Sequence, residues 1–359
     1  APVGSGPFRF VAWEQKRRFE MAAFDAYLLG RPKLDRVVFA ISTSAPTAVR
    51  AVLAGDADFI EQVTLEDVAE AARLPDVKIV PARRYEYGFL SFNLHTQDGK
   101  RPNPVFANAG VRRALTMAVD RAALVRNVHD SLGRPGLGPF SRSQWSADTT
   151  LRQIAYDTAG AARLLDSLGW RRRPDGTRAN GGQALAFSIV VSSSSRPRMR
   201  YAELLQQAFA KVGAKVEVDA ADMQAFVERI TTHKFDAVLF AWTATPSPTG
   251  ARQTWGSQAF KPGSPFNAGG WANAVFDAQV DSALASMDIA AARAHFRVAY
   301  QAAVDDPPAL WLYEPMVVAG ASRRLLTGPF RPDAWWASIR SWDVTGPPRR
   351  SAASSDKKP

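Results

Sequence analysis

The sequence contains no cysteine among its 359 residues. Disulfides, thiolate metal ligands and thiol nucleophiles are therefore excluded, although this absence assigns the chain to neither redox compartment. The chain has no run of about 18 apolar residues, so no membrane-spanning helix is expected. Residues 1–6 lack the basic start and apolar centre of a secretory signal, and no signal peptide is expected within them.

Histidine is scarce, and the usual catalytic patterns are missing. The serines at 192–195 lack the G-x-S-x-G pattern of a nucleophile elbow, and no phosphate-binding glycine pattern follows a strand. Asp56 and Asp58 fall at a helix-to-strand turn, where aspartate is a common turn residue. Four histidines lack the short spacings of a zinc site, and each is expected at the surface or in a loop: His95, His129, His233 and His295. The sequence therefore predicts no enzyme, no metal site and no cofactor.

The formal net charge is +11, but part of the excess is local. Arg171–Arg173 lie in a loop rich in proline and glycine, whereas Arg349, Arg350, Lys357 and Lys358 lie in the tail. A nucleic-acid-binding protein more often carries its cations along one helix or among exposed aromatic residues. We therefore expect no nucleic-acid partner.

The length and the hydrophobic content of 46% allow a large core and two domains. Strand-like and helix-like segments alternate, which predicts an α/β fold. Ser44 and Pro46 are expected to start a helix that joins strands at 34–41 and 58–60 in a βαβ unit. Two later helices should begin at Asn273, with Phe276, Val280 and Leu284 inside, and at Asp288, with Ala292, Phe296 and Ala299 inside. Residues after Val344 are rich in Pro, Ser and Lys, which favours disorder.

The most informative stretch is 235–249, FDAVLFAWTATPSPT. Its first half is almost wholly apolar and predicts a strand that is buried on both faces. Pro246 and Pro248 cannot donate backbone hydrogen bonds, so the strand should end just past Trp242. Ligands collect at the carboxyl ends of strands in α/β sheets, which makes Trp242, Thr243 and Thr245 candidates for a binding surface. The alternative is that Trp242 is a core residue at a strand end.

A second β-favouring segment, RYEYGFLSFN at 84–93, contains Tyr85, Tyr87 and Phe89 around a central Gly88. Glycine inside a strand often marks a bend or the close approach of another backbone.

Nine segments in this order resemble the C-terminal two-thirds of the family 5 extracellular solute-binding proteins, the dipeptide, oligopeptide and nickel binding components of ABC importers. The segments are GSGPFRFVAWE, GRPKLDRVVF, AVLAGDADFIE, YGFLSFN, VRRALTMAVDRAALV, YDTAGAARLLDSLGW, YAELLQQAFAKVGAKVEV, FDAVLFAW and ANAVFDAQVDSAL. Together they cover nearly the whole chain.

This resemblance implies a type II periplasmic-binding-protein-like fold, with two α/β lobes joined by a two-stranded hinge. It places the hinge strands at 87–93 and 310–315. Residues 1–86 and 319–345 would form part of the first lobe, which would be incomplete. Residues 87–318 would form the second lobe, and 346–359 a disordered tail.

The resemblance also implies which residues contact a ligand. Peptide-binding relatives carry an aspartate a few residues after the tryptophan, where it pairs with the α-ammonium group of the ligand. This chain has Thr245 there, and a hydroxyl cannot balance a buried positive charge. Met223 and Leu239 fall where some relatives place other ligand contacts. Tyr85, Tyr87 and Phe89 would line the hinge side, and their alternative role is core packing.

We therefore expect a monomeric binding component of an ABC importer that captures a peptide-like or other small organic solute by hinge closure. It would work with the membrane subunits of the importer at the periplasmic or extracellular face of a bacterial cell. The alternative is an interaction module without transport, or the C-terminal half of a split binding protein that needs a separate N-terminal part.

Overall fold

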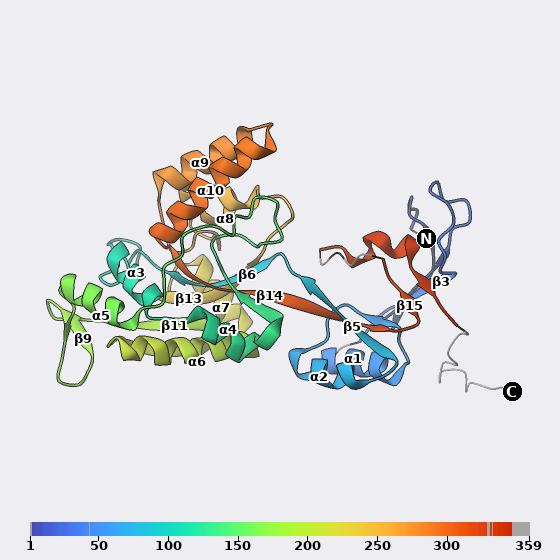
Figure 1. The fold of residues 1–359 in the computed structure, drawn as a ribbon, viewed down its shortest axis with the longest axis horizontal. Coiled ribbons are helices and arrows are strands. Elements are labelled where there is room, and N and C mark those ends of the chain that lie inside the picture. The colour runs from blue at the N-terminus through green and yellow to red at the C-terminus, as the bar shows by residue number, and fades with distance from the viewer. Residues whose placement is uncertain (1, 43, 329–330, 332, 347–359) are drawn as a thin grey trace. The chain divides into compact units, whose positions relative to one another are not determined.

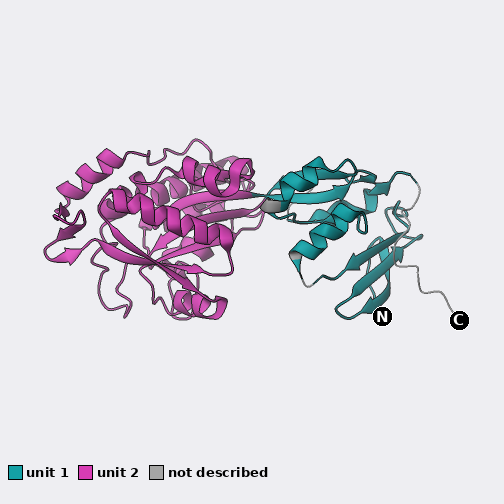
Figure 2. Ribbon diagram, turned by 90° about the horizontal axis from the view of Figure 1, so that it is seen from below, with its two compact units in different colours: residues 1–83, 316–359 teal, residues 84–315 magenta. Residues whose placement is uncertain are grey.

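The computed structural model describes residues 2–42, 44–328, 331 and 333–346, and the predicted disordered tail falls outside these residues apart from Gly346. The chain forms two compact units, coloured separately in Figure 2: unit 1 (residues 1–83 and 316–359) and unit 2 (residues 84–315). The chain enters unit 2 after Arg83 and leaves it after Pro315. Each crossing lies three residues before the expected lobe boundary, which was 86/87 on entry and 318/319 on return.

Unit 1 contains a three-stranded antiparallel sheet in the order β1-β2-β3. A second group of strands is formed by the end of β14, which pairs antiparallel with β4 and β5. The bounds are β1 (Phe8–Glu14), β2 (Arg18–Ala23), β3 (Arg36–Ala40), α1 (Ala45–Ala54), β4 (Phe59–Ile60), α2 (Leu65–Arg73), β5 (Val77–Arg83), β14 (Ala309–Ser322), β15 (Leu325–Leu326), the 3-10 helix η3 (Trp335–Ser341) and β16 (Asp343–Val344).

The predicted βαβ unit is wrong. β3 pairs with β2, whereas β4 pairs with β14, so the two strands belong to different sheets. The side chain of Ser44 makes no capping hydrogen bond, although α1 does have a proline in its first turn, as predicted.

Unit 2 is built on a sheet in the order β12-β11-β13-β6-β14, with β7 paired to β14 (Figure 1). β11 lies parallel to β12 and β13, whereas β6 is antiparallel to both β13 and β14. The strand bounds are β6 (Glu86–Phe92), β7 (Gly133–Pro135), β8 (Arg171–Arg172), β9 (Arg178–Asn180), β10 (Gln183–Ala184), β11 (Ala186–Ser192), β12 (Lys215–Ala221) and β13 (Ala237–Thr243). A mixed α/β fold was predicted, and it is confirmed.

Helices cover both faces of this sheet, and each face has its own core. On one face Leu90 and Leu239 pack with residues of α3, α5 and α6; on the other, Phe89 and Trp311 pack with residues of α8, α9 and α10. The helix bounds are α3 (Ala109–Met117), α4 (Arg121–His129), η1 (Asp130–Leu132), α5 (Thr158–Ser167), α6 (Arg196–Lys211), α7 (Met223–Thr231), α8 (Gly250–Trp255), η2 (Ser257–Ala259), α9 (Ala274–Ala285) and α10 (Ile289–Asp305).

Local sequence signals set several helix starts. The side chain of Asn273 accepts a hydrogen bond from Phe276 N, and Asp288 accepts one from Ala291 N, so both predicted caps are confirmed. The predicted inner face of α10 is confirmed as well. On α9 the prediction for Leu284 is wrong, because its side chain is exposed and the neighbouring Ala283 is buried instead.

Candidate functional site

The carboxyl end of β13 is an ordered strand terminus. Pairing with β6 continues to Trp242, opposite Tyr87, and to Thr243, opposite Glu86. One residue later, Ala244 N donates to Tyr85 O at 2.5 Å. β13 ends at Thr243, three residues before Pro246, so the predicted end of this strand just past Trp242 is confirmed.

Trp242 lies half-buried at the edge of an aromatic cluster. Its ring centroid is 4.7 Å from that of Phe240 and 5.1 Å from that of Phe266. Side chains alternate along a strand, so Trp242 shares a face with Tyr87 and Phe89, whereas Leu239 points to the opposite face. Trp242 therefore has one side in the core and another side open.

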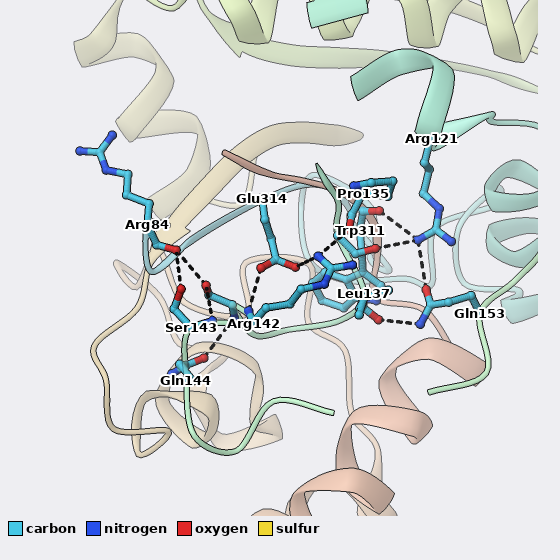
Figure 3. Close-up of polar contacts among 12 residues, drawn as sticks. Arg84, Arg121, Pro135, Leu137, Arg142, Ser143, Gln144, Gln153, Trp311 and Glu314 are labelled. Atoms are coloured by element: carbon cyan, nitrogen blue, oxygen red, sulfur yellow. Dashed lines mark hydrogen bonds and ion pairs between the residues drawn. The ribbon is translucent and has the colours of Figure 1, made fainter. Parts of the chain in front are cut away.

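The turn at Ser141–Gln144 fixes the loop that follows β13 through the side chain of Gln144, which Figure 3 labels. Gln144 is buried, and its Nε2 donates to Thr245 O at 3.0 Å and to Ser247 O at 3.3 Å. Its Oε1 accepts from Ser141 N at 3.2 Å. One amide side chain thus uses both its donor and its acceptor to hold two loops together.

The same turn also holds the first residue of unit 2. The Ser141 and Ser143 hydroxyls donate to Arg84 O at 3.0 and 3.4 Å, as Figure 3 shows. The segment where the chain enters unit 2 is therefore attached to the turn that fixes the loop after β13.

A buried ion pair attaches the segment by which the chain leaves unit 2. Glu314, on β14, accepts from the guanidinium and from the backbone N of Arg142, the latter at 2.7 Å. Arg142 Nη1 also donates to Pro135 O at 2.8 Å. Burial raises the pKa of Glu314 above its usual range, and the positive charge of Arg142 opposes that rise. A carboxylate at this depth needs such a partner.

A second polar group lies on the face of β6 opposite to the one that carries Tyr87 and Phe89. Glu86 is approached by Arg84 at 3.5 Å and by Arg198 at 4.0 Å. Arg198 Nε donates to the hydroxyl of Tyr313 at 3.3 Å. The ring of Tyr313 occupies the space beside Gly88, where an added Cβ would lie 2.1 Å from the ring. The sequence predicted a bend or the close approach of another backbone at this glycine, but the group that comes close is the side chain of Tyr313.

The predicted site residues have different environments. Thr243 and Thr245 are exposed, Met223 is 52% exposed at the start of α7, and Tyr85 is half-buried. The other three have almost no exposed surface and belong to the two cores: Tyr87, Phe89 and Leu239. In this structure no face of those three is open to a solute.

The polar residues that hold the site were missed at the sequence level: Gln144, Arg142, Glu314, Glu86 and Arg198. The contacts that join separate segments are distant in sequence: 101 residues separate Gln144 from Thr245, and 172 separate Arg142 from Glu314. A signal was present only for Glu314, an acidic residue within the otherwise apolar stretch of 309–322 that forms β14.

Two of the cavities among the described residues of unit 2 bear on the site. One, with a volume of about 10 Å³, is lined by Trp242, Phe240 and Trp255 among others, and it has room for one water molecule at most. The other, about 540 Å³, lies beside α7 and is lined by none of the predicted site residues; its lining includes Gln97, Asp219 and Arg229. Asp219 and Arg229 form an ion pair across it.

In the described part of the chain, no three His, Cys, Asp or Glu side chains come together as a metal site.

His129 was expected at the surface or in a loop, and this expectation is wrong. The residue is buried on α4, and burial lowers its pKa to about 4. Its ring centroid lies 5.0 Å from that of Tyr313 and 5.7 Å from that of Tyr201.

Among the helices described here, none is long and apolar enough to cross a bilayer.

Comparison with known proteins places this geometry in context. The model of the bacterial extracellular solute-binding proteins, family 5 Middle, matches residues 1–262. The oligopeptide-binding protein AppA of Bacillus subtilis is 28% identical over 319 residues, which are 88% of this chain and 57% of AppA. Heme-binding protein A of Haemophilus influenzae is 28% identical over 242 residues, 67% of this chain and 42% of that protein.

A solved structure of Bacillus subtilis AppA in complex with a nonapeptide superposes with a TM-score of 0.75 at 26% identity. The match covers 96% of this chain and 67% of that one. The chain therefore spans only about half the length of the curated relatives that it matches.

Proposed function

Because the chain belongs to family 5 of the bacterial extracellular solute-binding proteins and has their type II periplasmic-binding-protein fold, we propose that it captures a peptide-like or other small organic solute for an ABC importer. The observation that carries the proposal is the end of β13. There the half-open indole of Trp242 adjoins a loop whose carbonyl groups are fixed by Gln144. Members of this family are binding proteins rather than enzymes.

The contacts proposed for the solute are the predicted residues that have open surface: Trp242, Thr243, Thr245, Met223 and, in part, Tyr85. An aromatic ring with one free face offers apolar contact area, and the neighbouring hydroxyls offer hydrogen bonds. The buried residues Tyr87, Phe89 and Leu239 would act by supporting the strand ends.

The solute class follows from charge. AppA and the heme-binding protein are named for quite different ligands, so family membership alone does not select one. Thr245 is neutral, and its hydroxyl donates to Ser247 O at 2.9 Å. We therefore favour a solute that is uncharged at this position, such as a peptide whose amino terminus is blocked or held elsewhere.

Hinge closure, monomeric behaviour, delivery to the membrane subunits and a periplasmic or extracellular location belong to the same proposal. In such a mechanism the solute shifts the population toward a closed form that the importer recognises. X-ray scattering with and without solute tests closure, which should lower the radius of gyration of a monomer. The alternative of a module without transport is not favoured by the matched relatives.

The deciding experiment is a thermal-shift screen of the full chain against peptides of two to nine residues. Each peptide is supplied with a free and with an acetylated amino terminus. A solute that binds only the folded state must raise the melting temperature. We expect acetylated peptides to raise it at least as much as their free counterparts, and Trp242→Ala to remove the shift. No shift with any peptide or other small organic solute would overturn the proposal.

A further inference from the structure

The three consecutive arginines of the sequence lie on a small sheet in unit 2. β8, which contains Arg171 and Arg172, pairs antiparallel with β9, and β9 pairs in turn with β10. Arg173 follows at the turn, and all three arginines are exposed. Figure 1 shows this hairpin, labelled β9, projecting beside α5.

A buried arginine anchors the hairpin to the rest of unit 2. Arg178 is only 3% exposed. Its guanidinium donates to Trp170 O at 2.6 Å and to Val212 O at 2.8 Å, and it pairs with Asp166 at 2.5 Å. The hairpin is therefore fixed to the ends of α5 and α6, and its exposed arginines hold a defined position.

Two lysines from other segments join these arginines. Arg172 Nη2 donates to Lys211 O at 3.0 Å, which places the hairpin against the last turn of α6. Lys215 follows at the start of β12, where its backbone N donates to Leu185 O, just beyond β10. Both lysine side chains are exposed. We call this set of exposed cations the cationic face: Arg171, Arg172, Arg173, Lys211 and Lys215. The name refers to the cluster as a whole, because Arg171 and Arg172 are neighbours on a strand and point to opposite sides of the hairpin.

The cationic face keeps its charge. None of its five side chains forms an ion pair with a carboxylate in the part of the chain that the structure describes. Asp166 is engaged by Arg178, and Asp175 accepts from Thr177 N and Oγ1 within its own turn. Arg173 lies close enough to Asp175, and Arg171 and Arg172 to Asp166, to help lower the pKa of these carboxyl groups. Among the described residues the five cations thus have carboxylates nearby but no direct ion-pair partner.

We propose that the cationic face docks on a membrane surface rich in anionic phospholipid. Clusters of four to eight Lys and Arg residues are attracted to the negative potential of such a surface. The face draws its cations from separate segments and lines neither of the two cavities, which suits a diffuse array of headgroups better than a single bound anion. The hairpin residues 171–183 contain no aromatic side chain, which single-stranded nucleic acids would need for stacking. This inference does not depend on the solute.

The test is co-sedimentation of the full chain with vesicles of phosphatidylcholine, with and without phosphatidylglycerol. The face variant is Arg171→Gln, Arg173→Gln and Lys215→Gln, which leaves the hydrogen bonds of Arg172 intact. The control variant is Arg349→Gln, Arg350→Gln and Lys358→Gln, which removes the same charge from the tail. We expect wild type and control to bind only the anionic vesicles, in a salt-dependent manner, and the face variant to bind at least tenfold more weakly.

Three results would overturn the proposal. The face variant could bind as tightly as wild type, wild type could bind neutral vesicles as tightly as anionic ones, or the tail control could lose as much affinity as the face variant. If a short DNA duplex displaces the protein from the vesicles when its phosphate concentration is below that of the anionic lipid, the face would instead be assigned to nucleic acid. Melting temperatures show whether each variant folds. If the face variant does not fold, Lys211→Gln with Lys215→Gln provides the same comparison with two charges removed.

Discussion

Glu314 and Arg142 form an ion pair in which the side chains are only 8% and 16% exposed. Removing one member of a buried pair leaves an uncompensated charge, which costs about 3–5 kcal/mol. We predict that Arg142→Met lowers the free energy of unfolding by about 3 kcal/mol, measured by urea denaturation.

The matched control is the double variant Arg142→Met with Glu314→Gln. Neutralising the stranded carboxyl group should recover part of the loss, because the remaining amide is cheaper to bury than a charge. A double variant that is less stable than Arg142→Met alone would show that the two side chains do not act as a pair.

The burial of His129 predicts that the stability of the folded protein depends on pH. Its pKa in the folded protein is about 4, lowered by burial from an ordinary 6.5. Between these values the unfolded chain binds the proton and the folded chain does not, so stability falls as the pH drops from 6.5 toward 4. The loss attributable to this group is at most about 3 kcal/mol.

The measurement compares unfolding free energies of wild type and His129→Phe across that pH range. The difference in unfolding free energy between the two proteins should change by 1 kcal/mol or more over this range, about the effect of one pKa unit. Above pH 7 it should be constant, because histidine is then neutral in the folded and the unfolded state. A constant difference throughout would mean that His129 titrates normally in the folded protein.

Gln144 predicts an effect on the loop after β13. Gln144→Leu keeps the size of the side chain but removes both donors to Thr245 O and Ser247 O. We expect faster amide exchange at Thr249 and Ala251, whose N–H groups donate to Ser247 Oγ and Pro248 O, together with a stability loss of about 1–3 kcal/mol for the unpaired groups. Exchange in α10, which Gln144 does not hold, is the internal reference and should follow only the global stability. Unchanged exchange at both Thr249 and Ala251 would argue against this role.

Thr245 predicts a change in solute preference. Thr245→Asp places a carboxylate where the proposed site is neutral, and a charge-assisted hydrogen bond contributes about 1.5–3 kcal/mol. The affinity for a peptide with a free amino terminus should therefore rise about tenfold relative to its acetylated form. Calorimetry on both forms gives the ratio, and Thr245→Asn is the uncharged control. If Asn and Asp give the same ratio, position 245 does not face the amino terminus.

Gly88 predicts a steric effect. In Gly88→Ala the new Cβ would lie 2.1 Å from the ring of Tyr313, and the crowding should cost about 1–3 kcal/mol. Tyr313→Leu removes the ring, so the double variant should be more stable than the sum of the two single losses predicts. Additive losses would place the strain elsewhere.

Features that depend on neighbours in sequence could be predicted, as Asn273 and Asp288 illustrate. Each cap needs only its own side chain and an amide three residues later. The end of β13 was predictable for the same reason, because Pro246 stops backbone pairing locally. The overall α/β fold came from the order of whole segments rather than from any single contact.

Features that depend on tertiary partners could not be predicted. The βαβ expectation failed because the short strand β2 was not foreseen, and this strand is the one that pairs with β3. Leu284 was given an inside position by its spacing, but the packing of the neighbouring helices decides which side of an element is covered. Gln144 carries no local signal, since an isolated glutamine in a loop is ordinary until its distant partners are known.

The chain connectivity makes unit 2 an insertion within unit 1. Residues 84–315 are continuous, and the residues that flank them, Arg83 and Met316, lie opposite one another in the β5–β14 pair. Adjacent antiparallel strands can be joined by a two-residue turn. A deletion variant that links Arg83 to Met316 through such a turn would therefore remove unit 2 and leave the chain of unit 1 continuous. The same join is the natural point at which to graft the corresponding unit of another family member.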